Sequence, residues 1–268
     1  MKKSILLFFV LFLAGSVFAQ KKAYVSLGAG AGLGTARSYD LYSDGMKVHP
    51  VGLGKGLNIN LRAGYFLNDF MAIELGVAYR MGFNTKIDVS ESHGESSSTT
   101  TGNIKYSSNM LQLVPALVIS PDLGMDKLRP YARIGVIVGI LPSIKTKIDV
   151  TTSYLTSYNE VATLKYSGSV AIGGSAAIGC DYNLSDLLAI YAEIYYDALS
   201  YAPSKGKFTK FEENGKDMLP DMTTFDKEVK FVKDLTGFTP TPGDPDQHLK
   251  NNYSLNSLGL NIGIKIKL

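Results

Sequence analysis

Side chains that could carry out acid–base, nucleophilic or metal chemistry are few in this sequence. All three histidines lie in polar stretches that we expect to be loops, where no regular element would hold an imidazole beside a serine. Asp244 and Asp246 supply too few oxygen ligands for a calcium ion, and the single cysteine, Cys180, has no partner for an internal disulfide. We therefore expect no enzyme, no metal site and no cofactor. The histidines are His49, His93 and His248.

A run of alternate glycines, Gly28, Gly30, Gly32 and Gly34, imitates a phosphate-binding loop. A phosphate site of that kind needs a helix N-terminus directly after the glycines, and no helical pattern follows them. Apolar residues occupy the positions in between, so the run is more typical of a strand in a crowded wall.

A set of charged residues occurs inside otherwise apolar segments, always on the face opposite the apolar one. We interpret these residues as an ionic network that fills an interior, and the alternative is a gate across a narrow conduit. Tyr191 and Tyr195 share the same face and would line any cavity left there. The charged residues are Arg62, Glu74, Arg80, Arg133, Asp181, Glu193, Asp197 and Lys265.

The elements that must position these charges are segments in which every second residue is apolar. From Met71 to Phe83 the odd positions are large and apolar, whereas the even positions are small or charged. Membrane strands show this pattern because one face meets lipid and the other meets the lumen. Three segments, 105–119, 130–147 and 164–182, have apolar residues on both faces. The other five are 25–34, 57–65, 71–84, 188–197 and 257–268.

The gaps between these eight segments alternate in length. Short gaps at 67–69, 120–129 and 183–186 alternate with long polar gaps at about 37–54, 85–104, 148–163 and 202–252. The sequence therefore predicts an all-β fold: an eight-stranded antiparallel up-and-down transmembrane β-barrel with short periplasmic turns and long extracellular loops.

The first nineteen residues have the pattern of a secretory signal peptide. Lys2 and Lys3 precede an apolar stretch, and Val17-Phe18-Ala19 is a small-x-Ala cleavage site before Gln20. We expect 1–19 to be removed and 20–268 to form the barrel domain. The remaining 25 basic and 24 acidic residues nearly balance, which argues against a nucleic-acid partner.

The signal peptide, the eight amphipathic segments and the strand that ends the chain resemble the small OmpA- and OmpX-like outer-membrane barrels, and the composition resembles barrels of Bacteroidetes-type bacteria. Leu268 departs from the aromatic residue usual at the end of that family. The resemblance implies the outer membrane of a Gram-negative bacterium, with lipopolysaccharide and phospholipid around the barrel. We expect a monomer.

Counting residues from the short turns predicts two charged levels in the lumen. It places Arg62 directly opposite Glu74 across the hairpin at Asn68. The lower level contains Arg62, Glu74, Arg133 and Lys265, and the upper level contains Arg80, Glu193 and Asp197. We expect aromatic girdles from Tyr24, Tyr65, Phe66, Phe70, Tyr79, Phe83, Tyr131, Tyr182, Tyr196 and Tyr253.

The long gaps would carry any specific recognition. In the fourth, Thr223 and Asp226 predict a capped amphipathic helix, although Glu228–Phe231 also fits a strand. In the second, residues 96–101 are a low-complexity Ser/Thr run that we expect to be mobile. Apolar candidates for a lid or an adhesive surface in the fourth gap are Phe225, Val229, Val232 and Leu235.

These patterns favour a non-catalytic barrel with a structural or surface-interaction role, displaying its loops to an extracellular protein or surface partner. The first alternative is a narrow channel or carrier for a small or hydrophobic solute. The second is an outer-membrane enzyme.

Overall fold

The computed structural model describes residues 22–36, 38–39, 50–93, 98–125, 127–153, 156–237 and 239–268. The expected signal peptide and His49 lie outside the described residues. Eight strands make the barrel wall: β1 (Ala23–Gly34), β4 (Gly56–Phe66), β5 (Met71–Gly82), β7 (Ser98–Ile119), β8 (Leu128–Ser153), β10 (Ala171–Asn183), β11 (Leu188–Tyr201) and β17 (Ser257–Lys267).

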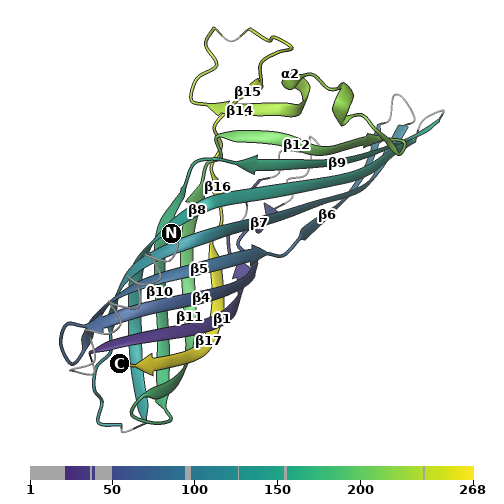
Figure 1. The fold of residues 1–268 in the computed structure, drawn as a ribbon. Coiled ribbons are helices and arrows are strands. Elements are labelled where there is room, and N and C mark those ends of the chain that lie inside the picture. Colours follow the sequence, from purple (N-terminus) through teal and green to yellow (C-terminus); the bar gives the residue numbers. More distant parts are fainter. Residues whose placement is uncertain are drawn as a thin grey trace, which may run out of the picture.

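The eight wall strands form a closed antiparallel ring in the order β1-β4-β5-β7-β8-β10-β11-β17 (Figure 1). The ring closes because β17, the last strand, pairs with β1, for example Leu27 with Ile264. The predicted eight-stranded fold is therefore confirmed. Closure gives every wall strand two neighbours, so the wall itself has no free edge.

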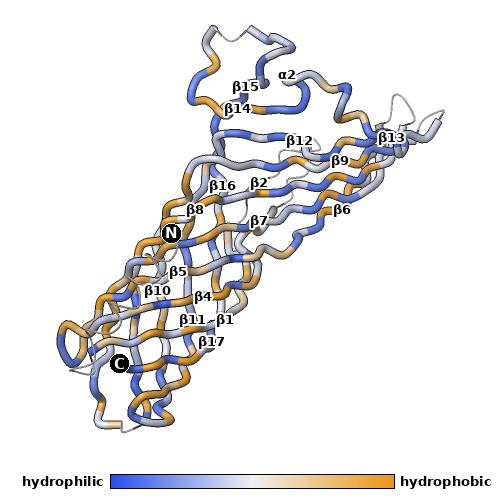
Figure 2. The backbone as a smooth tube through the Cα atoms, in the orientation of Figure 1, coloured by the Kyte–Doolittle hydropathy of each residue, from blue (hydrophilic) through white to orange (hydrophobic). Residues whose placement is uncertain are grey.

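Side chains alternate across the wall as the sequence predicts. In β4 and β11 every second residue is buried inside the ring while its neighbours face outward. The outward residues are large and apolar, such as Ile59 (51% exposed) and Ile73 (52% exposed). Apolar residues recur along the wall strands in Figure 2.

The short gaps lie at one end of the ring, where β1 begins and β17 ends, with Tyr24 opposite Lys267. At the β4–β5 turn the Asn68 side chain accepts hydrogen bonds from the backbone N–H groups of Phe70 and Met71, at 3.1 and 2.8 Å. Such side-chain-to-backbone bonds are why asparagine favours turns.

At the opposite end, β7 and β8 continue beyond the ring into a second sheet, which we call the upper sheet, in the order β6-β7-β8-β9-β12-β14-β15. It leans to one side of the barrel in Figure 1. Its other strands are β6 (Thr85–His93), β9 (Ser157–Ser167), β12 (Lys205–Glu213), β14 (Glu228–Val232) and β15 (Asp246–Leu249). Smaller elements are β2 (Ser38–Tyr39), β3 (Pro50–Val51), β13 (Lys216–Asp217), the 3-10 helix η1 (Leu219–Asp221), α2 (Thr224–Lys227) and β16 (Tyr253–Ser254).

The expectation that 85–104, 148–163 and 202–252 are loops is thus largely wrong. Their polar residues point outward from a sheet whose inner face is apolar, with Ile87, Ile104 and Ile148 buried. Residues 98–101 of the Ser/Thr run, expected to be mobile, belong to β7 and pair with β6 and β8. His93 ends β6 and His248 lies in β15, so both are in strands.

A β-bulge separates the two halves of β8. The pairing of β7 with β8 shifts by one residue between Asn109 and Leu111, and Leu141 has a positive φ of 52° and is 81% exposed. Pro142, which lacks a backbone N–H to donate to the ladder, lies next to the bulge. Below the bulge Arg133 points inward, whereas above it the even-numbered Ile144 points inward.

The segment expected as one strand, 164–182, is two strands. Gly168 and Ser169 have positive φ values of 82° and 58° and break the chain between β9 and β10. Both strands pair with β8, β9 on its upper half and β10 on its lower half.

The helix predicted in the fourth gap lasts only one turn. The expected cap is present, because Thr223 Oγ1 accepts from the backbone N–H of Asp226 at 3.2 Å. Glu228 then adopts extended dihedrals and begins β14, so the strand alternative was right. In β14 Val229 and Phe231 face the upper-sheet interior, a packing that one helical face could not provide.

Candidate functional site: a closed charged lumen under an open sheet

The structure buries all eight predicted charged side chains inside the ring, each less than 9% exposed. Four are cationic and four anionic, so the lumen is balanced in formal charge. Burial of this kind requires that the charges be paired and hydrogen-bonded. The network therefore decides whether anything else fits in the barrel.

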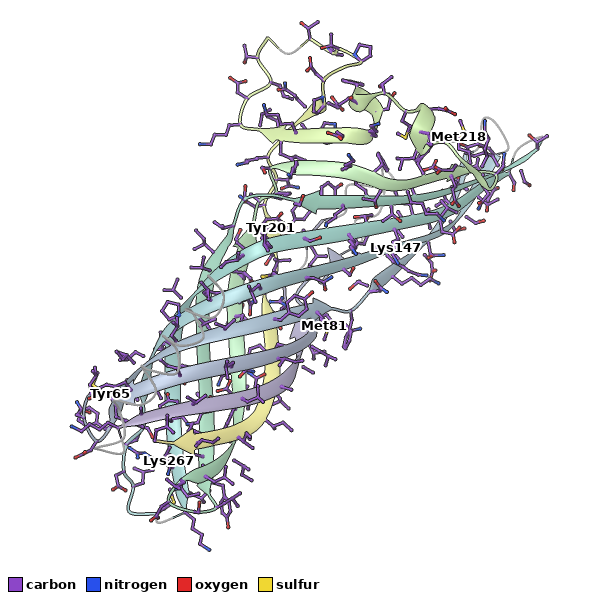
Figure 3. The ribbon with its side chains drawn as sticks, in the orientation of Figure 1. Tyr65, Met81, Lys147, Tyr201, Met218 and Lys267 are labelled. Carbon is purple, nitrogen blue, oxygen red and sulfur yellow. The ribbon has the colours of Figure 1, made fainter. Side chains whose placement is uncertain are left out.

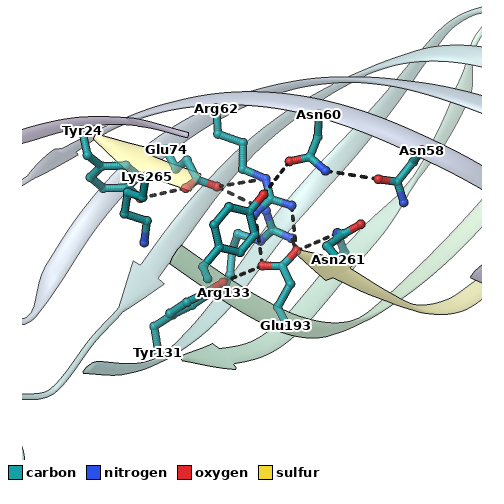
Figure 4. Close-up of polar contacts among 12 residues, drawn as sticks. Tyr24, Asn58, Asn60, Arg62, Glu74, Tyr131, Arg133, Glu193, Asn261 and Lys265 are labelled. Carbon is teal, nitrogen blue, oxygen red and sulfur yellow. Dashed lines mark hydrogen bonds and ion pairs between the residues drawn. The ribbon is translucent and has the colours of Figure 1, made fainter. Parts of the chain in front are cut away.

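Glu193 on β11 is the centre of the network (Figure 4). Its carboxylate accepts two hydrogen bonds from the Arg62 guanidinium, at 2.7 and 3.1 Å, and one from Arg133 at 2.8 Å. The Tyr131 hydroxyl donates to it at 2.9 Å and the Asn261 amide at 2.8 Å. Five hydrogen bonds from four side chains on three strands converge on this carboxylate, which ties the walls of the ring together.

Glu74 on β5 is a second acceptor. It takes hydrogen bonds from the Tyr24 hydroxyl at 2.7 Å and from Arg133 at 3.3 Å, while Arg62 Nε is 4.0 Å away. The prediction that Arg62 and Glu74 are directly opposite is wrong, because Arg62 opposes Gly76. The turn lies one residue later than assumed, because the Leu67 N–H donates to the Met71 carbonyl at 2.8 Å, and that shifts the register by two.

The predicted charge levels also need correction, because Glu193 lies with Arg62 and Arg133 instead of with Arg80. Neighbouring strands of a barrel are staggered, so equal counts from a turn do not give equal heights. Lys265 forms its own pair nearer the turns, with Asp181 at 2.5 Å, and lies over the ring of Tyr131 at 4.8 Å.

A chain of tyrosines and asparagines crosses the lumen above Glu193. The Tyr191 hydroxyl donates to Asn60, Asn60 donates to Asn58, and Asn58 donates to the Tyr195 hydroxyl, all at 3.0 to 3.1 Å. The glycines of β1 make room for it, since a Cβ at Gly28 would lie 1.9 Å from the Tyr191 hydroxyl.

Three of the residues expected in aromatic girdles instead fill the interior. Tyr24, Tyr131 and Tyr253 are each less than 7% exposed. Phe66 is packed against Tyr24, with 5.6 Å between ring centroids. Six of the expected residues are more than a third exposed on the outer surface: Tyr65, Phe70, Tyr79, Phe83, Tyr182 and Tyr196.

The lumen contains a small polar cavity. A cavity of about 40 Å³ lies among Asn58, Gln112, Arg133, Asp197 and Asn261, with room for about three water molecules. In this layer Asp197 accepts from the Ser175 hydroxyl at 2.8 Å.

The lumen is covered on the side of the upper sheet. Arg80 donates to the backbone carbonyl of Leu255 at 2.6 Å, and the Ser108 hydroxyl donates to that of Leu53 at 2.7 Å. Leu53 and Leu255 are each less than 5% exposed. The segments that contain Leu53 and Leu255 fold inward and cover the end of the ring that is nearer to the upper sheet.

Residues with possible catalytic or metal-binding roles are not assembled. In the part of the chain that the structure describes, no three His, Cys, Asp or Glu side chains are grouped to hold a metal ion. His248 Nε2 lies 2.8 Å from Asp246 of the same strand. Cys180 is a free thiol on β10. None of the described helices is long and apolar enough to span a membrane.

A family model for the outer membrane protein β-barrel domain matches residues 5–225. The chain belongs to this outer-membrane barrel family. Its location is therefore the outer membrane of a Gram-negative bacterium, and the apolar outer surface of the ring faces lipid. No match was found among curated proteins.

Several solved outer-membrane barrels are similar. Neisserial surface protein A is 13% identical, with 92% of this chain and 97% of that chain covered and a TM-score of 0.41. OprG from Pseudomonas aeruginosa is 15% identical, with 92% and 96% covered and a TM-score of 0.46. Ail from Yersinia pestis is 13% identical, with 91% and 98% covered and a TM-score of 0.35. The expected resemblance to Bacteroidetes proteins stays a prediction.

In this outer-membrane barrel the upper sheet lies on the side opposite the short periplasmic turns, outside the cell. Its inner face has a compact apolar core, in which Tyr166 contacts Phe231 with 5.7 Å between centroids. Of the four predicted interaction residues, Val229 packs against that core, Phe225 and Val232 are half-buried, and Leu235 is 37% exposed. The structure does not bring these four together as one apolar surface.

The sequence reasoning missed the outer face of the upper sheet. Its strands are rich in lysine at outward positions, as at Lys145 and Lys147 of β8. The signal that could have found it is the alternation of Lys with Ile and Thr over 144–148, which is that of a strand with one apolar face.

Proposed function

We propose that this protein is a non-catalytic surface-interaction barrel, in which a closed ring anchors an extracellular β-sheet that engages other molecules. The observation that carries the proposal is the continuation of β7 and β8 from the ring into the upper sheet. These strands are 22 and 26 residues long, about twice what a membrane strand needs. The upper sheet is thus built on two strands of the wall and is held rigidly to it.

The filled lumen favours this role over a channel. A conducting path would have to pass the Glu193 network, the Tyr191–Asn60–Asn58–Tyr195 chain and the Leu53–Leu255 cover in turn. Each of these uses buried hydrogen bonds whose loss would leave charged or polar groups unpaired. The remaining 40 Å³ cavity is too small for a solute larger than a few waters.

The experiment compares the intact protein with a variant in which 205–249 is replaced by a short Gly-Ser linker. This replacement removes β12 to β15 and leaves the eight ring strands untouched. We expect cells displaying the variant to lose attachment to serum-protein-coated or polysaccharide-coated surfaces while the variant still shows the heat-modified gel mobility of a folded barrel. Both proteins should show no single-channel steps in planar bilayers.

Two results would overturn the proposal. One is equal attachment by cells with the full protein and cells with the truncated protein. The other is a stepwise conductance of the full protein that an Arg80→Ala substitution abolishes, which would favour the narrow channel.

A further inference from the structure

The outer face of the upper sheet carries lysines that lie directly opposite one another on neighbouring strands. In a first row, Lys105 of β7 is opposite both Lys86 of β6 and Lys147 of β8. In a second row, Lys165 of β9 is opposite both Lys145 of β8 and Lys207 of β12. A further pair joins Lys205 of β12 to Lys230 of β14. We call these eight residues the lysine rows.

Direct opposition of like charges in a sheet is destabilising, and few acidic groups relieve it here. Lys86 pairs with Asp88 at 2.6 Å and Lys207 with Glu228 at 2.8 Å. Among the described residues, the other six lysines of the rows have no carboxylate within ion-pair distance: Lys105, Lys145, Lys147, Lys165, Lys205 and Lys230. The fold therefore maintains a concentrated positive surface on which, among the described residues, acids pair with only two of the eight lysines.

The position of the rows relative to lipid indicates what compensates them. Leu141, on the same outer face of β8, is the last large apolar residue before the rows and is 81% exposed. Lys145 and Lys147 follow four and six residues later, about 13 and 20 Å along the strand. With a strand tilt of about 40°, they stand roughly 10 to 15 Å above that residue. Figure 3 shows Lys147 where the sheet extends beyond the ring.

That height corresponds to the headgroup layer of the outer leaflet and the sugars directly above it. The outer leaflet of a Gram-negative outer membrane contains phosphorylated glycolipid, whose phosphates are anionic. We propose that the lysine rows bind the phosphates of this glycolipid and so hold the upper sheet against the membrane surface. The binding site is independent of whether the sheet also engages a partner outside the cell.

The spacing of the rows suits several phosphates at once. Neighbouring strands are about 4.8 Å apart, so six strands from β6 to β14 spread the charges over roughly 24 Å. Lysine is a flexible point charge that reaches phosphates without demanding a fixed geometry. The lysine rows therefore suit a lipid surface with laterally mobile headgroups better than a single pocket would.

The test uses the full-length protein in a neutral detergent, titrated with bisphosphorylated lipid A and with chemically dephosphorylated lipid A, with bound lipid counted by native mass spectrometry. The row variant carries Lys145→Gln, Lys147→Gln and Lys165→Gln. The control variant carries Lys216→Gln, Lys233→Gln and Lys250→Gln, which removes the same charge from exposed positions outside the rows.

We expect the row variant to bind phosphorylated lipid A roughly a hundredfold more weakly than the wild type, because each basic side chain at an anionic surface contributes about a fivefold factor. The control variant should bind like the wild type, and dephosphorylated lipid A should bind weakly to all three. The row variant should unfold at the same temperature as the wild type or higher in lipid-free detergent, since like-charge neighbours are removed. A site with only a structural role would not give this combination.

Three outcomes would overturn the proposal. The first is equal binding by the row and control variants, and the second is equal affinity for lipid A with and without phosphates. The third is row-dependent binding of a soluble sulfated polysaccharide such as heparin without binding of lipid A, which would assign the rows to an extracellular polyanion instead.

Discussion

The ring and the upper sheet share the strands β7 and β8, and the two halves of these strands have opposite chemistry. In the lower half of β8 the charged Arg133 points inward and the apolar Ile134 outward, whereas in the upper half Ile144 is buried and Lys145 exposed. The lower half thus meets lipid with an apolar surface and buries its charges in pairs. The upper half meets water and headgroups with lysines and buries a conventional apolar core. The single strand β8 therefore passes through two environments, lipid along its lower half and water and headgroups along its upper half.

The bulge at Leu141 changes which positions of β8 face inward. Below it, odd positions of β8 face inward, and above it, even positions do. An extra residue in one strand of a pair changes which face the following side chains occupy. β7 has no such shift and keeps its even positions inward throughout.

Insertion of one alanine between Ser143 and Ile144 is the strongest way to break the comparison. With the bulge and the lower half of β8 unchanged, the added residue would turn Lys145 and Lys147 inward and Ile144 outward. We expect the upper sheet to lose its fold and to be cleaved by trypsin as readily as an unfolded segment, while the ring keeps its heat-modified gel mobility. Limited proteolysis with mass spectrometry of the fragments measures this.

Leu141→Gly is the matched control, because it leaves the number of residues in β8 unchanged and glycine adopts a positive φ without strain. It should retain the protease protection of the wild type. If the insertion variant also retains that protection, the number of residues in β8 does not set the faces of the upper sheet.

The change of surroundings along β7 and β8 explains what the sequence could and could not predict. Strands with one environment per face, such as β4 and β11, show clean alternation and were found, with the ring order following from the alternating gap lengths. The segments 105–119 and 130–147 looked irregular because β7 and β8 pass from lipid to water, where the apolar face changes sides. Alternation that reverses along one strand has no fixed period for a pattern search to detect.

The lumen was predictable in composition and not in pairing. Parity alone placed all eight charges inside, because a charge on a lipid-facing position would be too costly. Alternation also predicts that Tyr24 points inward, because Tyr24 shares its face of β1 with Ser26 and Gly28. Its position near a strand end suggested an aromatic girdle instead, and that interpretation was wrong. Which charge meets which depends on strand stagger and on the Asn68 turn, and neither is encoded in the spacing of charges.

Glu193→Ala tests the lumen with the next largest effect. The substitution leaves Arg62 and Arg133 buried with their main acceptor gone, and the loss of one partner of a buried pair costs about 3–5 kcal/mol. Because the sequence has no tryptophan, unfolding in urea is best followed by circular dichroism of the protein in lipid vesicles. Glu212→Gln, which breaks the exposed pair with Lys210 at 2.8 Å, should cost under about 1 kcal/mol. Equal losses in the two variants would contradict a network that stabilises the ring.

Tyr131→Phe sharpens the account of that network. It removes one hydroxyl donor to Glu193 and keeps the ring that lies beside Lys265. A hydrogen bond to a charged group contributes about 1.5–3 kcal/mol, so we expect a loss of stability in that range by the same urea measurement. Tyr182→Phe, which removes a hydroxyl on the outer surface, is the control and should be nearly neutral. A loss as large for Tyr182→Phe would assign the effect to the wall and not to the lumen.

Glu228→Gln gives the smallest expected effect and tests the outer face of the upper sheet. The hydrogen bond from Lys207 holds the pKa of Glu228 below its usual range. A carboxyl with a lowered pKa in the folded protein stabilises the fold above its unfolded pKa of about 4.3, and that contribution is lost as the pH falls through the folded value. At pH 7 we therefore expect the variant to be less stable than the wild type by under about 1 kcal/mol, and the difference should shrink as the pH falls through the folded pKa of Glu228. A difference that does not change with pH would show that Glu228 acts through packing and not through the effect of its charge on Lys207 of the second lysine row.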